Sequence, residues 1–459
     1  MNQEVTLPLW AFVLILLFAV VTFASHFLFP SVRWFFRKRA ERVIARLNTR
    51  LQRPIEPFKL ARRYDMIQRL IYDPEVTRAI VAHAEAEDVP ESVAFEQAKR
   101  YAREIVPGFS ATAYFTIGMR LAKWLSRALY RVRIASFDRA TLSRIDPDAT
   151  VIFVINHRSN MDYVLVTHLV SRATSLSYAV GEWARVWPLS AIIRAMGAYF
   201  IRRKSRGQLY RKVLARYVQM ATTNGVTQAM FPEGGLSVSG AVGDPKLGLL
   251  NYIVGQTERD VIFVPVGINY DRVLEDTFLV AAETSGRRRF RPPLLTTVRR
   301  ILSHLWRRVR GRFRGFGVAS VGFGRPLELS AFREGRGEEM TQELGEELMR
   351  RIKEIVPVLS APLVAYLLTH RAPMTRTELL VAVRSVMAGL GEMKMPIPQR
   401  KPEVFLSDTL DRFRERGLIA VSDEKITVTD LGDPILTYYG RSIAHHLENL
   451  PRGSDAIAA

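Results

Sequence analysis

The chain has 459 residues, 48% of them hydrophobic, and carries a formal net charge of +21 at pH 7. This length predicts two or three folded units, and the excess of cations predicts an anionic partner: phospholipid, nucleic acid or a phosphorylated substrate. There is no cysteine, which excludes disulfides, a cysteine nucleophile and cysteine-bound zinc, and fits a reducing compartment.

The first predicted element is an apolar segment, LPLWAFVLILLFAVVTFASHFLF, which runs from Leu7 to Phe29 without an acidic residue, a lysine or an arginine. A helix of this length rises ~34 Å, enough to cross the hydrocarbon core of a bilayer. Eight lysines and arginines follow between Arg33 and Arg53, and none precedes the segment. The positive-inside rule therefore predicts that residues 1–30 are a single-pass transmembrane anchor in the inner (plasma) membrane, with the rest of the chain cytoplasmic. A helix buried in the core is the alternative.

Three regions are predicted after the anchor. Residues 31–110 alternate charged and apolar residues at three- and four-residue spacing, which predicts helices. Residues 111–357 combine helical segments with short apolar runs, which predicts an α/β domain with helices flanking the sheet. Residues 358–459 are predicted to be mainly helical, with a hairpin at LIAVSDEKITVT. The apolar runs of the α/β domain occupy residues 151–155, 228–231, 261–268 and 317–324.

One charge run stands out between Arg287 and Arg314, where eleven arginines occur without an acid and are interleaved with apolar residues. This mixture is typical of an amphipathic element that lies on anionic lipid. A solvated basic loop and a nucleic-acid-binding arm are the alternatives. The predicted membrane segment favours lipid over nucleic acid.

The stretch INHRSNMDYV follows the apolar run at 151–155 and precedes a helical pattern, so it predicts a strand-to-helix turn. His157 would then be exposed at the carboxyl end of a strand, where α/β folds bind ligands. If His157 precedes the helix, Asp162 can accept a hydrogen bond from one imidazole nitrogen and leave the other free as a base. The alternative is that Ser159 and Asp162 form a capping box and do no chemistry.

Further cationic candidates lie downstream. The apolar stretch GAYFIRR ends in Arg202 and Arg203, and the planar fork of arginine suits phosphate oxygens. Lys246, in DPKLG, is another candidate for a phosphate contact. A pair of surface arginines without a ligand is the alternative.

Two further candidate ligand-binding stretches lie at the ends of predicted strands, and each contains glycine or proline. In FPEGGLS, Gly234 and Gly235 allow the backbone to approach a ligand with its N–H groups, and Glu233 either orients a substrate hydroxyl or holds the loop through backbone N–H groups. A plain turn is the alternative. In VPVGINYDRVLED, Pro265 interrupts an apolar strand, which predicts an edge or a bend.

Taken in order, NHRSNMD, GAYFIRR, FPEGG and VPVGINYDR resemble the motifs of the glycerolipid acyltransferase superfamily, and most closely those of the glycerol-3-phosphate acyltransferases. The resemblance covers residues 111–330 and implies an acyltransferase domain with a mixed sheet and flanking helices. The first stretch is similar to the HX4D motif, which implies that His157 is the base and Asp162 its partner. The second implies that Arg202 and Arg203 bind the glycerol phosphate.

The later motifs carry further implications. Glu233 and Gly234 match the third block, which is assigned to the acceptor, and Pro265 matches the fourth, which is linked to the acyl donor. One departure is Leu236, where the family commonly has arginine. Its absence removes an expected phosphate contact and leaves the identity of the acceptor open.

The resemblance implies transfer of a fatty acyl group from acyl-CoA or acyl carrier protein to the 1-hydroxyl of glycerol 3-phosphate, which gives lysophosphatidate for phospholipid synthesis. Neither a metal nor a cofactor is expected; the adjacent His445 and His446 are expected on a helix surface. Lysophosphatidate and dihydroxyacetone phosphate are alternative acceptors. A serine hydrolase is disfavoured because Ser237 lies in GLSVS, which lacks the second glycine of a nucleophile elbow. The non-enzymatic alternative is a membrane-tethered basic binding protein.

Overall fold

The structure is a computed structural model of the full chain. It describes residues 8–136, 144–171, 173–181, 185, 187, 189–202, 207–255, 259–286, 299, 303, 306, 315–337, 339–448 and 450. Arg203 and nearly all of the predicted lipid-binding charge run at 287–314 lie outside these residues.

The chain divides into two compact units, Met1–Ile55 and Glu56–Ala459. The first contains α1 (Leu9–Asn48), a single helix that continues through the boundary predicted at residue 30. The second unit contains the sheet, the part of the predicted helical region 31–110 that follows residue 55, and the predicted helical region 358–459.

The predicted transmembrane anchor is not supported by the described residues. Among them, no single helix has both the length and the hydropathy of a membrane span, and the apolar part of α1 is Leu9–Val20. One pair of helices, Met340–Ile355 and Ser360–Arg371, passes the same test together, with a bend of 94° between them.

The second unit is organised around one eight-stranded mixed sheet with the order β1-β7-β6-β2-β5-β3-β4, in which β8 also pairs with β6. β6 is antiparallel to β7 and β8, and the other neighbouring strands are parallel. The four strands predicted from apolar runs are all present. The strands are β1 (Arg131–Ser136), β2 (Thr150–Ile155), β3 (Ser177–Gly181), β4 (Tyr199–Ile201), β5 (Gln228–Met230), β6 (Val261–Tyr270), β7 (Val318–Phe323) and β8 (Leu327–Glu328).

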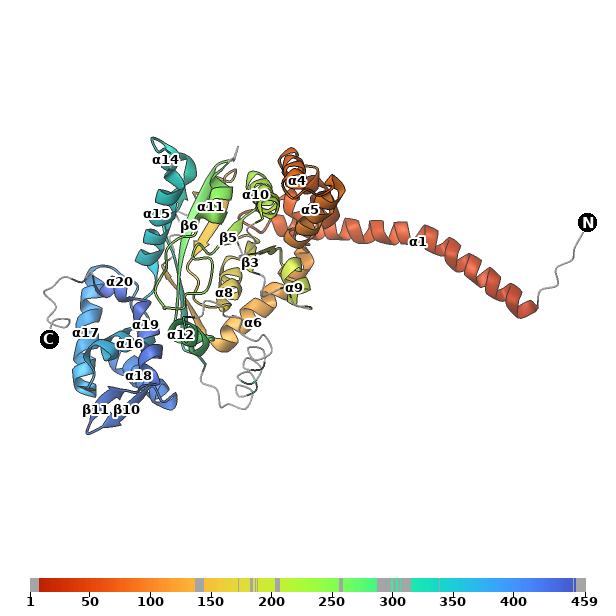
Figure 1. Ribbon diagram of the computed structural model, residues 1–459. Coiled ribbons are helices and arrows are strands. Elements are labelled where there is room, and N and C mark those ends of the chain that lie inside the picture. Colours follow the sequence, from red (N-terminus) through yellow and green to blue (C-terminus); the bar gives the residue numbers. More distant parts are fainter. Residues whose placement is uncertain are drawn as a thin grey trace, which may run out of the picture. The chain divides into compact units, whose positions relative to one another are not determined.

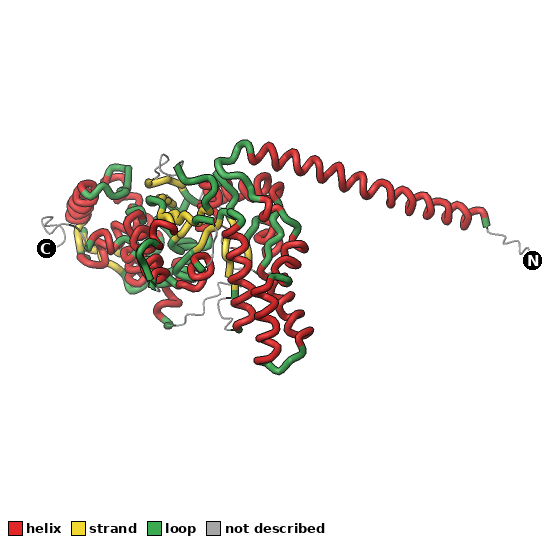
Figure 2. Tube along the Cα trace, turned by 90° about the horizontal axis from the view of Figure 1, so that it is seen from above, coloured by secondary structure: helices red, strands yellow, loops and turns green. Residues whose placement is uncertain are grey.

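Each face of the sheet is covered by its own hydrophobic core. Because side chains alternate along a strand, Val151, Phe153 and Ile155 of β2 enter one core, and Ile152 and Val154 enter the other. Both faces are thus buried, which explains why β2 is an uninterrupted apolar run. Figure 2 shows the strands, in yellow, enclosed among the helices.

The core that contains Val151 also includes side chains of α6, α8, α12 and the C-terminal helices. The core that contains Ile152 includes side chains of α3 to α5, α10, α11, α14 and α15 (Figure 1). The helices of this unit up to residue 355 are α2 (Pro57–Leu60), α3 (Arg63–Ile71), α4 (Pro74–Ala86), α5 (Glu91–Ile105), the π-helix η1 (Ala113–Gly118), α6 (Met119–Leu129), α8 (Met161–Val170), α9 (Leu189–Ala195), α10 (Gln208–Thr223), α11 (Leu247–Val254), α12 (Asp276–Thr284), α14 (Leu329–Arg333) and α15 (Met340–Ile355).

The C-terminal region is mainly helical, as predicted, and the predicted hairpin is present as β10 and β11. Asp423 and Glu424, at its tip, both have positive φ, which matches the twist of a two-residue hairpin loop. The elements are α16 (Ser360–Arg371), β9 (Met374–Thr375), α17 (Arg376–Glu392), α18 (Pro402–Glu415), β10 (Ile419–Ser422), β11 (Lys425–Val428), α19 (Gly432–Arg441) and α20 (Ala444–Leu447).

The prediction that His445 and His446 lie on a helix surface is wrong. His446 is 5% exposed, and its Nε2 is 2.9 Å from the carbonyl oxygen of Val356. His445 Nε2 lies 2.9 Å from the carbonyl oxygen of Lys353. The two imidazoles therefore contact carbonyl groups at the end of α15, and that of Lys353 also accepts from the N–H of Val356.

The prediction that Pro265 marks an edge strand is wrong, because β6 is a central strand and all ten of its residues are buried. β6 pairs with β8 at Ile262 and Phe263 and with β7 from Val266 onward. Pro265 lies where the antiparallel partner changes, and its carbonyl oxygen accepts from the N–H of Gly324. The missing N–H of proline therefore falls at a gap in the ladder, which a central strand otherwise does not tolerate.

Candidate active site

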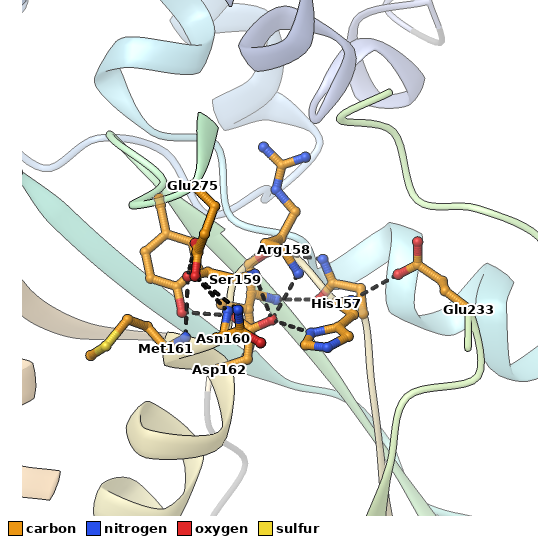
Figure 3. Close-up of polar contacts among 11 residues, drawn as sticks. His157, Arg158, Ser159, Asn160, Met161, Asp162, Glu233 and Glu275 are labelled. Atoms are coloured by element: carbon orange, nitrogen blue, oxygen red, sulfur yellow. Dashed lines mark hydrogen bonds and ion pairs between the residues drawn. The ribbon is translucent and has the colours of Figure 1, made fainter. Parts of the chain in front are cut away.

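The candidate catalytic pair lies at the carboxyl end of β2, in the turn that leads into α8 (Figure 3). His157 and Asp162 are 1% and 0% exposed, and His157 Nδ1 lies 2.9 Å from Asp162 Oδ2. His157 precedes the first residue of α8, so the five-residue separation does not place the two side chains on different helix faces. The structure thus brings the two residues together as the sequence predicts, but the predicted exposure of His157 is wrong, because the turn buries its side chain.

The Asp162 carboxylate accepts hydrogen bonds from several directions. Oδ2 accepts from the backbone N–H groups of Arg158, at 2.7 Å, and Ser159, at 3.0 Å, as well as from the imidazole. Oδ1 accepts from the Tyr270 hydroxyl at 2.6 Å. The bond from the Ser159 N–H is one half of a capping box, but Ser159 Oγ accepts from the N–H of Met161 instead of completing it. Asp162 therefore orients the imidazole and holds the backbone of the turn that precedes α8.

The imidazole of His157 is fixed by aromatic rings. It stacks on Phe231, with ring centroids 4.1 Å apart, and meets the edge of Tyr163 at 5.4 Å. Because Nδ1 donates to Asp162, the lone pair lies on Nε2, which has no hydrogen-bond partner among the described residues. This nitrogen is the candidate general base.

The FPEGG loop is tied to the catalytic turn through Glu233, which is buried. One carboxylate oxygen accepts from the N–H of His157 at 2.8 Å and the other from the N–H of Gly243 at 3.1 Å. Burial raises the pKa of Glu233, and the two backbone N–H groups act against that shift. The N–H of Ser237 donates in turn to the carbonyl oxygen of His157 at 2.8 Å. Of the two roles left open by the sequence, Glu233 therefore holds the loop.

Lys246 lies over the same loop. A Cβ at Gly234, whose φ is +68°, would come within 2.8 Å of Lys246 Cδ, so only glycine leaves room for the lysine chain. The N–H of Lys246 donates to the carbonyl oxygen of Pro232 at 2.8 Å, and its side chain is exposed. Gly235 and Leu236 continue the loop, and Leu236 packs against the hydrophobic core. The loop thus presents one lysine where the family commonly also has an arginine.

Arg202 is held by a partner that the sequence does not indicate. Its Nε and Nη2 donate to the two oxygens of Glu104 on α5, at 2.8 and 2.6 Å, and these bonds raise the pKa of Arg202. Arg185 also pairs with Glu104, at 2.6 Å, and the backbone N–H of Arg202 donates to the Tyr210 hydroxyl. One buried carboxylate therefore aligns two half-exposed guanidinium groups and leaves a net positive charge. Among the described residues, no hydrogen bond joins Arg202, Arg185 or Glu104 to the His157 turn.

Sequence reasoning missed Tyr270 and Glu275, which reach the turn from the far end of β6. Glu275 accepts from Ser159 Oγ at 2.7 Å and from Asn160 Nδ2 at 3.1 Å. Burial, with Asp162 nearby, raises the pKa of Glu275 to about 7. Tyr270 lies in the fourth motif and Glu275 three residues after it, but their contacts depend on β6 lying beside β2, which no local signal predicts.

Arg158, inside the first motif, was also missed. It is 1% exposed, its Nη1 donates to the carbonyl oxygen of Gly240, and its guanidinium lies 4.7 Å from the ring centroid of Tyr438 on α19. The close-up shows the guanidinium directed away from the imidazole of His157 (Figure 3). Arg158 therefore connects the turn to the C-terminal helices and does not point into the catalytic pair.

The chain matches models of known families and several known proteins. Residues 137–269 match the model of the Acyltransferase family, and residues 302–449 match that of the glycerol-3-phosphate acyltransferase C-terminal region. A glycerol-3-phosphate acyltransferase of Pseudomonas putida is 26% identical over 422 residues, which cover 85% of this chain and 50% of that protein. One of Aeromonas hydrophila is 28% identical over 417 residues, or 84% of this chain and 50% of that protein. The chain thus spans about half the length of the curated relatives it matches.

Among solved structures, a 1-acyl-sn-glycerophosphate acyltransferase of Thermotoga maritima matches with a TM-score of 0.33 and 21% sequence identity. The match covers 56% of this chain and 82% of that one.

Proposed function

We propose that this chain, which belongs to the glycerol-3-phosphate acyltransferase family, transfers a fatty acyl group from an acyl thioester to the 1-hydroxyl of glycerol 3-phosphate. The product is lysophosphatidate, a precursor of phospholipids. The observation that carries the proposal is the buried pair of His157 and Asp162, with Nε2 of the imidazole free at the carboxyl end of β2.

In the proposed reaction, His157 Nε2 accepts the proton of the acceptor hydroxyl as that oxygen attacks the thioester carbonyl. The tetrahedral intermediate then expels the thiolate, and the imidazolium returns the proton to the sulfur. Asp162 stabilises the imidazolium and remains ionised, as the aspartate does in a serine-protease triad, but here the substrate hydroxyl replaces the serine. Burial and the neighbouring Asp162 raise the pKa of Tyr270, so its hydroxyl stays protonated and holds the carboxylate in place.

The acceptor phosphate is proposed to interact with the cations that surround the site. Lys246 on the FPEGG loop is exposed, and Arg202 and Arg185 share one carboxylate between two positive charges. The family resemblance adds Arg203 to this set. These groups compensate for the arginine that Leu236 replaces.

The acyl donor is proposed to be acyl-CoA or acyl carrier protein, both of which are anionic and suit a chain of net charge +21. The reaction needs no resident cofactor or metal, because His157 moves the proton and the thioester is already activated.

We also propose that the enzyme works at the inner (plasma) membrane, with the catalytic domain on the cytoplasmic side. The apolar part of α1, Leu9–Val20, exposes large side chains such as Trp10 and Phe18, at 68% and 73%. A lipid surface would remove this apolar area from water and would supply the anionic partner that the charge requires. Nucleic acid is not a proposed partner.

The test supplies the purified chain in lipid with palmitoyl-CoA or palmitoyl acyl carrier protein and radiolabelled glycerol 3-phosphate. The proposal expects label in lysophosphatidate, and its loss in His157→Ala. Turnover only when lysophosphatidate or dihydroxyacetone phosphate is the acceptor would show that Leu236 marks a changed substrate. Binding of lipid without turnover of any acceptor by either donor would support the tethering protein instead.

A further inference from the structure

Two tyrosines, Tyr130 and Tyr270, separate a cavity from the pair of His157 and Asp162. It has a volume of about 990 Å³ and is formed by the end of α6, the starts of β1 and β7, the segment after β6, and α18. Tyr130 lines it, and the Tyr130 ring lies 5.2 Å from that of Tyr270, whose hydroxyl donates to Asp162. None of the predicted site residues lines the cavity, so it is separate from the catalytic turn.

Arginines dominate the charge of the cavity wall, where three carboxylates face six guanidinium groups. Two of the six have carboxylate partners at 2.6 Å: Arg400 pairs with Asp408, and Arg416 pairs with Asp276 behind the wall. The six arginines are Arg127, Arg131, Arg272, Arg400, Arg412 and Arg416.

The positive charges of the other four arginines are less well balanced by carboxylates. Arg412 lies beside Asp271, but that carboxylate already accepts the N–H groups of Val318 and Ala361, at 2.7 and 3.0 Å. Among the described residues, the guanidinium groups of Arg127, Arg131 and Arg272 have no hydrogen-bond or ion-pair partner.

Arg272 is the most constrained of these groups. Its guanidinium lies 4.8 Å from the ring centroid of Phe316, and burial together with the charge of Arg416 lowers its pKa. An anion in the cavity would relieve this repulsion and take up N–H donors that now face the cavity without partners.

The wall is also partly apolar. Leu129, Phe316, Phe405 and Phe413 line the same cavity as the arginines. A volume of this size accommodates a ligand of several hundred Å³, with an apolar part against these side chains and a few polar groups that fix its orientation. Guanidinium groups suit the oxygens of a phosphate monoester, which can accept several N–H donors at once.

We propose that this cavity binds the phosphate group of an amphiphilic phosphate monoester, at a site separate from the catalytic turn. The proposal goes beyond the acyl transfer proposed above and does not depend on it. Binding at this site requires neither His157 nor a thioester.

The test measures binding to the full chain by isothermal titration calorimetry, without an acyl donor. The probes are hexanoylglycerol phosphate, which is short enough to stay monomeric in water, hexanoylglycerol, which lacks the phosphate, and inorganic phosphate. The cavity variant combines Arg127→Gln, Arg131→Gln and Arg412→Gln. The control variant loses the same charge outside the cavity, through Arg100→Gln, Arg325→Gln and Arg376→Gln. If the cavity variant does not fold, Arg412→Gln is compared with Arg376→Gln.

We expect the cavity variant to bind hexanoylglycerol phosphate about tenfold or more weaker than wild type, and the control within about twofold. We also expect wild type to bind both of the other probes about tenfold or more weaker. Equal weakening in the two variants would overturn the proposal, because the attraction would be a general charge effect. Unchanged affinity in the cavity variant would overturn it by placing the ligand elsewhere, including the acceptor site. If hexanoylglycerol or inorganic phosphate bound as tightly as hexanoylglycerol phosphate, the ligand would not be an amphiphilic phosphate monoester, and the proposal would be overturned.

Repeating the titration with His157→Ala separates this proposal from the acyltransferase proposal. The same affinity is expected in that variant whether or not wild type turns over. A loss of affinity there would overturn the cavity as the site.

Discussion

The catalytic turn and the arginine pair on Glu104 are built from similar groups in different surroundings. The side chains of His157 and Asp162 are 2% and 0% exposed, whereas those of Arg202 and Arg185 are 35% and 37% exposed. Charge interactions are strong away from water and weak when half-solvated. Under the proposed acyltransferase function, we expect the turn to determine the rate of the chemical step and the arginines to adjust affinity for the acceptor.

The sharpest way to break this comparison is to neutralise Asp162. Asp162→Asn replaces one accepting oxygen by an NH2 group, while the N–H groups of Arg158 and Ser159 still point at that position. We expect kcat to fall by about 10³-fold, because the imidazolium loses its counter-charge and the tautomer is no longer fixed. Steady-state kinetics and urea unfolding check this. An unchanged kcat in a folded variant would assign Asp162 to helix capping alone.

A smaller effect is expected at Tyr270. Tyr270→Phe removes the 2.6 Å hydrogen bond to Asp162 without changing the ring, and should lower kcat by about tenfold with little change in KM. Tyr178→Phe is the matched control, because its hydroxyl bonds Thr167 at 3.0 Å and does not contact the pair. Equal losses in the two variants would show that packing, and not the support of Asp162, accounts for the effect.

Disturbing the arginine pair on Glu104 should change KM. Glu104→Gln removes the charge that aligns Arg202 and Arg185, so KM for glycerol 3-phosphate should rise by about three- to tenfold while kcat changes little. Glu96→Gln on the same helix breaks only an exposed pair with Lys99 and serves as the control. If kcat falls and KM stays constant, the distinction between the two regions fails.

Glu275 gives a further prediction in the pH dependence of stability. Burial raises its pKa to about 7 from a usual value of about 4.3, so the folded state binds the proton more tightly than the unfolded chain. Its contribution to the free energy of unfolding is full below about pH 4 and is lost as the pH rises through 7. Glu275→Gln should flatten the decline of stability between pH 4.5 and 7 by about 1–3 kcal/mol, measured by urea unfolding. Glu334→Gln, at an exposed position, should leave the decline unchanged; an unaltered slope in Glu275→Gln would exclude this carboxyl as its source.

The sequence predicted the parts of the fold that have strong local signals. The four long apolar runs became buried strands, and the turn between β2 and α8 followed from its polar residues. β1, with its alternating arginines, and the three-residue β4 were not predicted as strands, although the equally short β5 was. Their places in the sheet depend on pairing with distant strands.

The same reason explains what was missed at the site. Tyr270 and Asp162 are separated by 108 positions, and Ser159 and Glu275 by 116, so their contacts follow from the parallel pairing of β2 and β6. Pro265 was misassigned because its place depends on where β7 gives way to β8. Local chemistry identified the candidate catalytic pair, and only the fold identified what supports it.

The central claim, that Nε2 of His157 is the base, is tested most directly by chemical rescue. Acyl transfer from palmitoyl-CoA to radiolabelled glycerol 3-phosphate is measured for His157→Ala with and without added imidazole. The alanine leaves a space beside Phe231, where the ring of His157 stacks. We expect transfer to be lost and then partly restored by imidazole. Transfer at the wild-type rate in the variant without imidazole would contradict the account.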